Sequence, residues 1–174
     1  MSGSAGTPAL VLLQTRGVAY TVHSYEIVEP SGVETHRGER AAYGPAAAAA
    51  LGIAPARLFK TLVLLLENER PGGELVLAVL PSDAELSERA VAHAFGAKRA
   101  ALASEAQVQR ATGSVPGGVS PLGSRKPMRT LIDVSADGFT TLLVSAGRRG
   151  LAVELAPADL AALCTASYAP IAVK

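Results

Sequence analysis

The sequence lacks several features that would identify common classes of protein. It has one cysteine, Cys164, which excludes an intramolecular disulfide framework and a zinc or redox motif built on paired cysteines. Its apolar runs, such as residues 61–66, are far shorter than the roughly 18 to 20 residues that a membrane span requires, and its first residues lack the basic and apolar regions of a signal peptide. We therefore expect a cytoplasmic protein that makes no membrane contact.

Ready-made catalytic and cofactor motifs are also missing. There is no GxSxG, HExxH or GxxxxGK segment. The histidines His23, His36 and His93 fall in different predicted elements without metal-ligand spacing, so we predict no metal and no cofactor. With 16 basic against 15 acidic residues, any nucleic-acid contact must come from a local cluster of charges.

The composition predicts one folded domain. Hydrophobic residues make up 49% of the chain and charged residues 18%, far from the composition of a disordered protein. A length of 174 residues suits a single domain. We expect residues 1–6, which are small and polar, to form a flexible lead to a domain at 7–174.

Local patterns predict a mixture of helices and strands. Residues 29–44 read as a long surface loop and a candidate lid, and residues 115–123 as a loop shaped by glycine and proline. Because the elements do not alternate strictly, we expect an α+β fold with a mixed, mainly antiparallel sheet that curls towards a barrel with flanking helices. The predicted helices are 9–16, 45–51, 83–95, 104–111 and 157–165, and the predicted strands are 18–28, 58–66, 75–80, 130–134, 140–145 and 151–155.

A few residues suggest chemistry without any family assignment. Lys60 enters an apolar strand, where a cation is costly to desolvate, although strand-end lysines commonly reach water. The pair Gly117 and Gly118 would let a backbone approach a ligand closely, although such pairs often form simple turns. Cys164 lies in an apolar helix and is predicted to be core, not a nucleophile. Five basic residues could hold phosphates or remain solvated: Arg125, Lys126, Arg129, Arg148 and Arg149.

The order and spacing of several segments resemble the YbaK/EbsC family over about residues 7–172. These segments are Thr7-Pro8-Ala9, His23-Ser24-Tyr25-Glu26, Phe59-Lys60-Thr61-Leu62, Ala111-Thr112-Gly113, Gly117 to Gly123, Ile132-Asp133 and Val144-Ser145 through Arg149-Gly150-Leu151. The resemblance is closer to the free-standing YbaK deacylases of Cys-tRNA(Pro) than to the editing domain inserted in bacterial prolyl-tRNA synthetases.

The resemblance implies a trans-editing hydrolase that removes cysteine from the 3′ end of tRNA(Pro), with Cys-tRNA(Cys) as an alternative substrate. Lys60 would be the essential lysine, and the backbone at Gly118 would also serve catalysis. In such a mechanism the substrate's own thiolate attacks the ester, so the protein only orients the substrate and stabilises charge. The partners implied are the tRNA acceptor end, held by the five basic residues, and prolyl-tRNA synthetase. The substrate-binding residues implied are Tyr25, Tyr43, Thr61, Gly117, Ser120 and Ser145.

One position departs from the family. Ala152 stands where relatives carry an acid, and Glu154 follows two positions later on the same strand face. Either Glu154 takes over the role of that acid or the substrate differs. Two alternatives therefore remain: a deacylase for another small amino acid, as in Ala-tRNA(Pro), and a non-catalytic module that binds tRNA or a synthetase.

Overall fold

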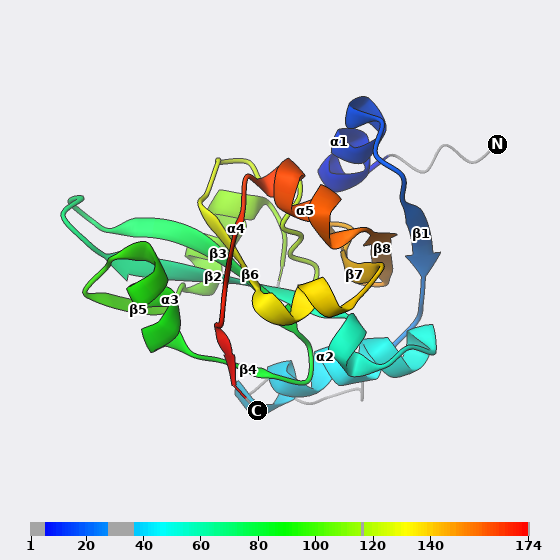
Figure 1. Ribbon diagram of the computed structural model, residues 1–174, viewed down its shortest axis with the longest axis horizontal. Helices are drawn as coiled ribbons and strands as arrows, with labels where there is room; N and C mark the ends of the chain where they lie inside the picture. The colour runs from blue at the N-terminus through cyan, green and yellow to red at the C-terminus, as the bar shows by residue number, and fades with distance from the viewer. Residues whose placement is uncertain (1–5, 28–36, 116, 174) are drawn as a thin grey trace.

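The computed structural model of the protein describes residues 6–27, 37–115 and 117–173 (Figure 1). The first part of the predicted 29–44 loop and most of the predicted lead lie outside these ranges. Five α-helices and ten strands fall within them. The helices are α1 (Pro8–Arg16), α2 (Arg37–Leu51), α3 (Glu88–Phe95), α4 (Glu105–Thr112) and α5 (Pro157–Cys164). The strands are β1 (Thr21–Ser24), β2 (Phe59–Glu67), β3 (Glu74–Pro81), β4 (Glu85–Leu86), β5 (Arg99–Leu102), β6 (Thr130–Asp133), β7 (Leu142–Ser145), β8 (Leu151–Leu155), β9 (Ser167–Ala169) and β10 (Ala172–Val173).

The strands form an α+β fold with mixed pairing, as expected. A five-stranded sheet has the order β5-β2-β3-β6-β9, a three-stranded sheet has the order β1-β8-β7, and β10 pairs with β4. Pairing is antiparallel except between β3 and β6 and between β6 and β9. The expected curling towards a barrel is wrong. In the described ranges the backbone pairing between the two larger sheets is limited to one isolated bridge, Leu58 to Leu143, and closure of a barrel would need a continuous hydrogen-bonded ladder.

The strands β2 and β3 lie at the centre and are buried on both faces. They pair over eight residues, from Phe59 with Pro81 to Leu66 with Glu74. One face packs on a core shared with α1, α5, β7 and β8, which includes Phe59 and Val79. The opposite face packs under α3 and includes Leu64 and Val76. This arrangement leaves the amino-terminal end of β2 between the two sheets, where Lys60 lies.

The helix α2 begins inside the segment predicted to be a loop. It includes the predicted 45–51 helix but starts at Arg37, so the loop prediction is wrong from residue 37 onward. Tertiary packing holds the helix at Gly44, which approaches Ser82 so closely that a Cβ there would lie 2.6 Å from the serine Cβ. Ala47 and Ala48 are fully buried on the same helix. Small side chains therefore let α2 lie against the end of β3, which the local pattern did not reveal.

Candidate functional site

Two tyrosines from distant parts of the chain meet beside β8. Tyr25 follows β1 and Tyr43 lies on α2, and their side chains share a hydrogen bond. The Tyr25 N–H also donates to the Gly150 carbonyl at 2.9 Å. Burial, followed by the hydrogen bond with Tyr43, raises the pKa of Tyr25 well above its usual value. The Tyr25 phenol is therefore neutral at physiological pH and can serve as a hydrogen-bonding wall of a pocket.

The paired glycines face this tyrosine pair. A Cβ on Gly117 would lie 3.1 Å from both the Tyr43 ring and the Arg149 Nε, and Gly117 has a φ of +84° that disfavours any side chain. A Cβ on Gly118 would lie 3.0 Å from the Arg149 backbone nitrogen. The Arg149 guanidinium lies over the Tyr43 ring, 5.5 Å from its centre. The structure thus brings together Tyr25, Tyr43, both glycines and the β7–β8 turn.

The Gly118 N–H is already used within its own loop. It donates to the Val115 carbonyl at 2.9 Å. What Gly118 offers a ligand is therefore its missing side chain and its carbonyl oxygen, not an N–H donor. Ser120, a few residues later, is buried, and its hydroxyl accepts the Leu122 N–H at 3.2 Å. Its hydroxyl shapes the loop.

Lys60 lies on the face of β2 that also carries Leu58. Leu58, directly before β2, packs in a cluster with Tyr25 and Tyr43, whereas Leu62, two residues after Lys60 on the same face, packs under α3. Alternation therefore places Lys60 on this face between the two clusters. The Lys60 Nζ donates to the Ala84 carbonyl at 2.6 Å. Burial lowers the pKa of Lys60, and the nearby carboxylates of Glu85 and Asp83 oppose that shift.

Two hydroxyls predicted for the site have different surroundings. Thr61 points to the other face of β2, and its buried hydroxyl has no hydrogen-bond partner among the described residues. Ser145 pairs with Ala152 across β7 and β8, and its hydroxyl accepts the Gly147 N–H at 3.2 Å. Alternation places Ser145 on the face of Leu143, which packs with the tyrosines. Ser145 therefore joins the site through the sheet face, whereas Thr61 lies behind it.

The face of β8 beside the tyrosines carries no free carboxylate. Ala152 is 1% exposed and packs in the cluster with Tyr25 and Tyr43. Glu154 is engaged elsewhere, because its carboxylate accepts from His23 at 2.9 Å, Arg57 at 2.7 Å and Thr141 at 2.6 Å. The hydrogen bond from Thr141, followed by that from His23, lowers the pKa of Glu154. These contacts speak against Glu154 as a stand-in for an acid at position 152.

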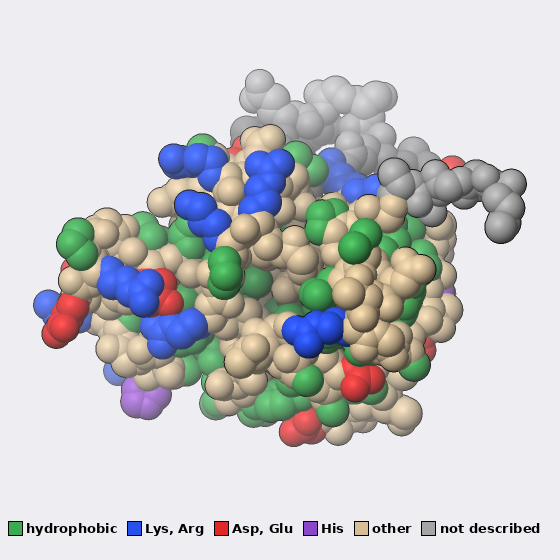
Figure 2. Space-filling view, turned by 90° about the horizontal axis from the view of Figure 1, so that it is seen from above, with side chains coloured by type: hydrophobic (Ala, Val, Ile, Leu, Met, Phe, Trp, Pro, Cys, Tyr) green, Lys and Arg blue, Asp and Glu red, His purple; other side chains and the backbone are tan. Residues whose placement is uncertain are grey.

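The five basic residues do not form one group. Arg148 and Arg149 lie in the turn against Gly118, while the Arg125 guanidinium packs on Gly113 at the end of α4. Lys126 is exposed, and its N–H donates to the Ala111 carbonyl. On the face shown in Figure 2 the basic side chains form separate groups, not a continuous stripe. Of these five residues, Arg149 is the one with a contact to the tyrosine pair, and Arg148 precedes it in the same turn.

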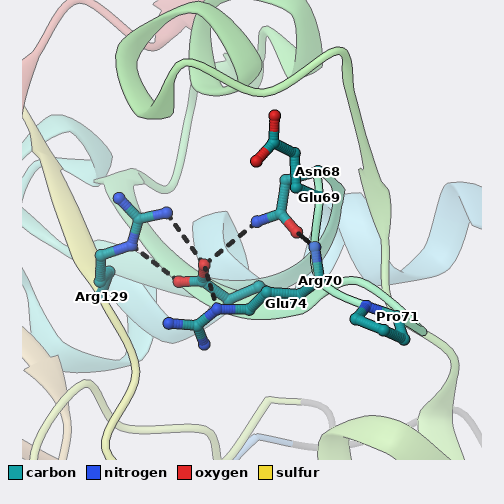
Figure 3. Close-up of a pocket in the computed structure, with 6 residues that line it drawn as sticks. All are labelled: Asn68, Glu69, Arg70, Pro71, Glu74 and Arg129. Atoms are coloured by element: carbon teal, nitrogen blue, oxygen red, sulfur yellow. Dashed lines mark hydrogen bonds and ion pairs between the residues drawn. The ribbon is translucent and has the colours of Figure 1, made fainter.

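Arg129 belongs to a hollow at the β2–β3 hairpin (Figure 3). Its guanidinium holds the Glu74 carboxylate through two hydrogen bonds of 2.7 and 3.0 Å and lies 4.7 Å from the centre of the Phe95 ring. Asn68 donates to the same carboxylate at 3.2 Å. These pairs bind the hairpin to the start of β6. The hollow is lined by Asn68, Glu69, Arg70, Pro71, Glu74 and Arg129, none of which belongs to the tyrosine cluster.

Comparisons with known proteins identify the family and the fold of the chain. The sequence profile of the aminoacyl-tRNA editing domain matches residues 39–163. EbsC of Enterococcus faecalis, named as a candidate Cys-tRNA(Pro)/Cys-tRNA(Cys) deacylase, is 35% identical over 127 residues, which are 73% of this chain and 75% of that protein. A proline–tRNA ligase of Ralstonia pickettii is 28% identical over 81% of this chain and 26% of the ligase. A crystal structure of a candidate trans-editing enzyme for prolyl-tRNA synthetase shares the fold, with a TM-score of 0.74 over 96% of each chain and 23% identity.

Proposed function

The chain belongs to the aminoacyl-tRNA editing domain family, and we propose that it is a trans-editing hydrolase that deacylates mischarged Cys-tRNA(Pro) with the substrate thiol as nucleophile. What supports the proposal is that the tyrosine-lined cluster, which lies on the side of the chain that Lys60 shares with Leu58, holds no activated nucleophile among the described residues. In the part of the chain that the structure describes, neither Thr61 nor Ser145 has a histidine or carboxylate as a hydrogen-bond partner. A hydroxyl without a general base is a weak nucleophile at neutral pH.

The protein's own thiol does not fill this gap. The Cys164 Sγ is directed to the Pro121 carbonyl at 3.4 Å, away from the tyrosine cluster, and packs against the core shared by α1 and α5. Burial raises the pKa of Cys164 to about 12, which keeps it as the unreactive thiol. A cysteine on the substrate is therefore the nucleophile best suited to this site.

The reaction balances without a cofactor. The substrate thiol loses its proton, and its sulfur forms a bond to the ester carbonyl carbon. The bond between that carbon and the ribose oxygen then breaks, the ribose oxygen takes up a proton, and the amino acid leaves as a cyclic thiolactone. A thiolate attacks far faster at neutral pH than a serine hydroxyl would.

Five of the predicted site residues have a defined role in this proposal. Lys60 supplies a cation that stabilises negative charge developing on the ester oxygens or holds the terminal phosphate. Tyr25 and Tyr43 line the aminoacyl pocket as neutral phenols. Gly117 and Gly118 let the loop backbone approach the ester, because a side chain at either would meet the tyrosine or the turn.

Contacts with tRNA are proposed at the acceptor end. Arg149 contacts Tyr43 and Arg148 precedes it in the same turn, which supports a role for both in binding the phosphates nearest the terminal adenosine. Arg125 and Lys126 would add further contacts with the acceptor end of the tRNA. Arg129 is already paired with Glu74, so its contribution would be small. These few basic residues cannot distinguish one tRNA from another, so binding to prolyl-tRNA synthetase would provide the selection of tRNA(Pro).

A second candidate substrate is Ala-tRNA(Pro). It is favoured by one observation, the apolar wall that Ala152 forms with Ala47, Ala48 and Leu143 beside the tyrosines. Such a wall suits a small apolar side chain. Water would then have to attack the ester, because alanine carries no nucleophile.

A deacylation assay with matched substrates tests the proposal. Cys-tRNA(Pro), Ser-tRNA(Pro), Ala-tRNA(Pro) and Pro-tRNA(Pro) are compared with the same enzyme, and the cysteine product is examined for thiolactone. Cys-tRNA(Pro) whose thiol has been alkylated serves as the control for thiol chemistry. We expect fast clearance of Cys-tRNA(Pro) alone. An alanine preference without thiolactone would establish the second candidate, and binding of tRNA without release of any amino acid would indicate a docking module.

A further inference from the structure

The side chain of Lys60 is held by a short segment after β3. Its ammonium donates to the Ala84 carbonyl at 2.6 Å, and the carboxylates of Asp83 and Glu85 act on it from either side of that residue. Ala84 is 5% exposed, so its carbonyl is shielded from solvent. The position of the ammonium therefore depends on where residues 83–85 are fixed.

The C-terminal strand fixes this segment. Glu85 and Leu86 form β4, which pairs antiparallel with β10 through Leu86 with Ala172 and Glu85 with Val173. The Ser87 N–H adds a hydrogen bond to the Ile171 carbonyl at 2.8 Å. Figure 1 shows the end of the chain beside β4, although the two segments lie far apart in the sequence. A ladder of two residue pairs is too short to hold without support from elsewhere.

Asp133 supplies that support at the end of β6. One carboxylate oxygen accepts the N–H groups of Ile171 at 3.0 Å and Ala172 at 2.9 Å. The other oxygen accepts the N–H and hydroxyl of Ser135 at 3.1 and 2.6 Å. Asp133 is 4% exposed, so this carboxylate, which accepts four hydrogen bonds, is buried. It holds the chain at Ile171 and Ala172, where β10 begins.

We propose that Asp133 and β10 are positioning elements for Lys60: Asp133 anchors β10, β10 anchors β4, and β4 fixes the carbonyl and carboxylates that hold the Lys60 ammonium. The consequence for deacylation rests on the proposed function, but the positioning itself does not. Loss of the anchor releases the 83–85 segment and exposes Lys60 to water. The ammonium of Lys60 then loses its fixed position.

Two variants break the anchor at different points. Removal of residues 172–174 takes away β10, and its control is removal of Lys174 alone. Asp133→Asn keeps the size of the side chain but replaces one acceptor oxygen by a donor, and its control is Asp137→Asn, an exposed acid in the same stretch of chain. If Asp133→Asn does not fold, the chain without residues 172–174 tests the anchor instead. Its loss of β10 removes only a short, partly exposed strand, so we expect it to fold.

The state of Lys60 is measured directly by NMR of protein carrying ¹³C-labelled lysine. The chain has four lysines, so Lys60→Arg identifies the Lys60 signal by its disappearance. We expect the Lys60 signal to shift and its titration to move up towards that of an exposed lysine in both anchor variants, and deacylation to fall at least tenfold. Both controls should match the intact protein in signal and rate.

The two proposals fail in different ways. An unchanged Lys60 signal and titration in the folded anchor variants would overturn the positioning role, whatever the enzyme's substrate. A shifted Lys60 signal in a protein whose intact form deacylates nothing would uphold the positioning role and overturn the proposed function. A fall in rate with an unchanged lysine signal would assign the effect of Asp133 to general loss of structure.

Discussion

Replacement of Lys60 by methionine separates its charge from its packing. Methionine keeps an unbranched apolar stem in the partly buried site and removes the ammonium. Removal of a single group that stabilises charge in a transition state costs about 10²- to 10³-fold in rate, so we expect kcat/KM for Cys-tRNA(Pro) to fall by about that factor. The Ala84 carbonyl loses its donor, but the cost of burying an ammonium also disappears, so the free energy of unfolding should change by only about 1 kcal/mol.

The assay compares kcat/KM with thermal unfolding of the same samples. A change of about 1 kcal/mol corresponds to a melting shift of about 2–4 °C for a chain of this length. Lys98→Met is the matched control, because Lys98 is exposed and its loss should change neither quantity. Hydrolysis by Lys60→Met within threefold of the unmodified protein would refute the catalytic assignment, and loss of folding would assign Lys60 to structure.

Three further outcomes are expected. Gly117→Ala should cost about 1–2 kcal/mol of backbone strain at its positive φ and should reduce kcat/KM because the new methyl group crowds Tyr43. The control, Gly138→Ala, adds a methyl group in open space and should leave the rate unchanged. Equal rates for the two variants would exclude a close approach at Gly117. Cys164→Ala should keep full deacylation and lose about 1 kcal/mol of stability by chemical denaturation; loss of turnover in the folded variant would show that the protein uses its own thiol. Glu154 has a lowered pKa in the folded state, so its contribution to stability is present above its unfolded pKa and is lost as the pH falls through the folded value. Glu154→Gln should therefore be less stable than the parent at pH 7 and equally stable in acid, and a constant difference at all pH values would contradict this linkage.

Elements with local signals were predictable from the sequence. Thr7 caps α1 by accepting the Leu10 N–H, and Gly17 ends the helix with a φ of +66°. Ser104 and Gln107 form a capping box at the start of α4. These interactions lie within four residues of each other, so the pattern of side chains contains them.

Elements that depend on distant partners were not predictable. The strand β5 forms only because Arg99–Leu102 pairs with the far end of β2, and β10 only because it pairs with β4. Of the predicted strand at 18–28, residue 28 lies outside the described residues, and within 18–27 only Thr21–Ser24 forms a strand, since β8 pairs with those four residues. The predicted helix at 83–95 begins at Glu88, because Glu85 and Leu86 are taken by β10.

The candidate site shows the same division. Lys60, Gly117 and Gly118 could be selected from the sequence because a cation in an apolar strand and paired glycines are unusual there. The hydrogen bond between Tyr25 and Tyr43 could not, since it depends on how α2 packs on β8. Asp133 belongs to a segment that the sequence already singled out. Its role could not be predicted, because its hydrogen-bond donors lie before and after α5 and form no local sequence pattern.

The absence of an acid at position 152 bears on how such a site would choose its substrate. Strand alternation places Ala152 and Glu154 on one face of β8, but the Glu154 carboxylate is taken up by Arg57, His23 and Thr141. A substrate ammonium beside Ala152 therefore gains no charge-assisted hydrogen bond, which would otherwise be among the stronger contacts available. Cysteine, serine and alanine esters all carry this ammonium, so the missing contact weakens the binding of each of them alike. If the site acts as proposed, a substrate that carries its own thiol gains selectivity from the reaction itself, because its advantage lies in the transition state.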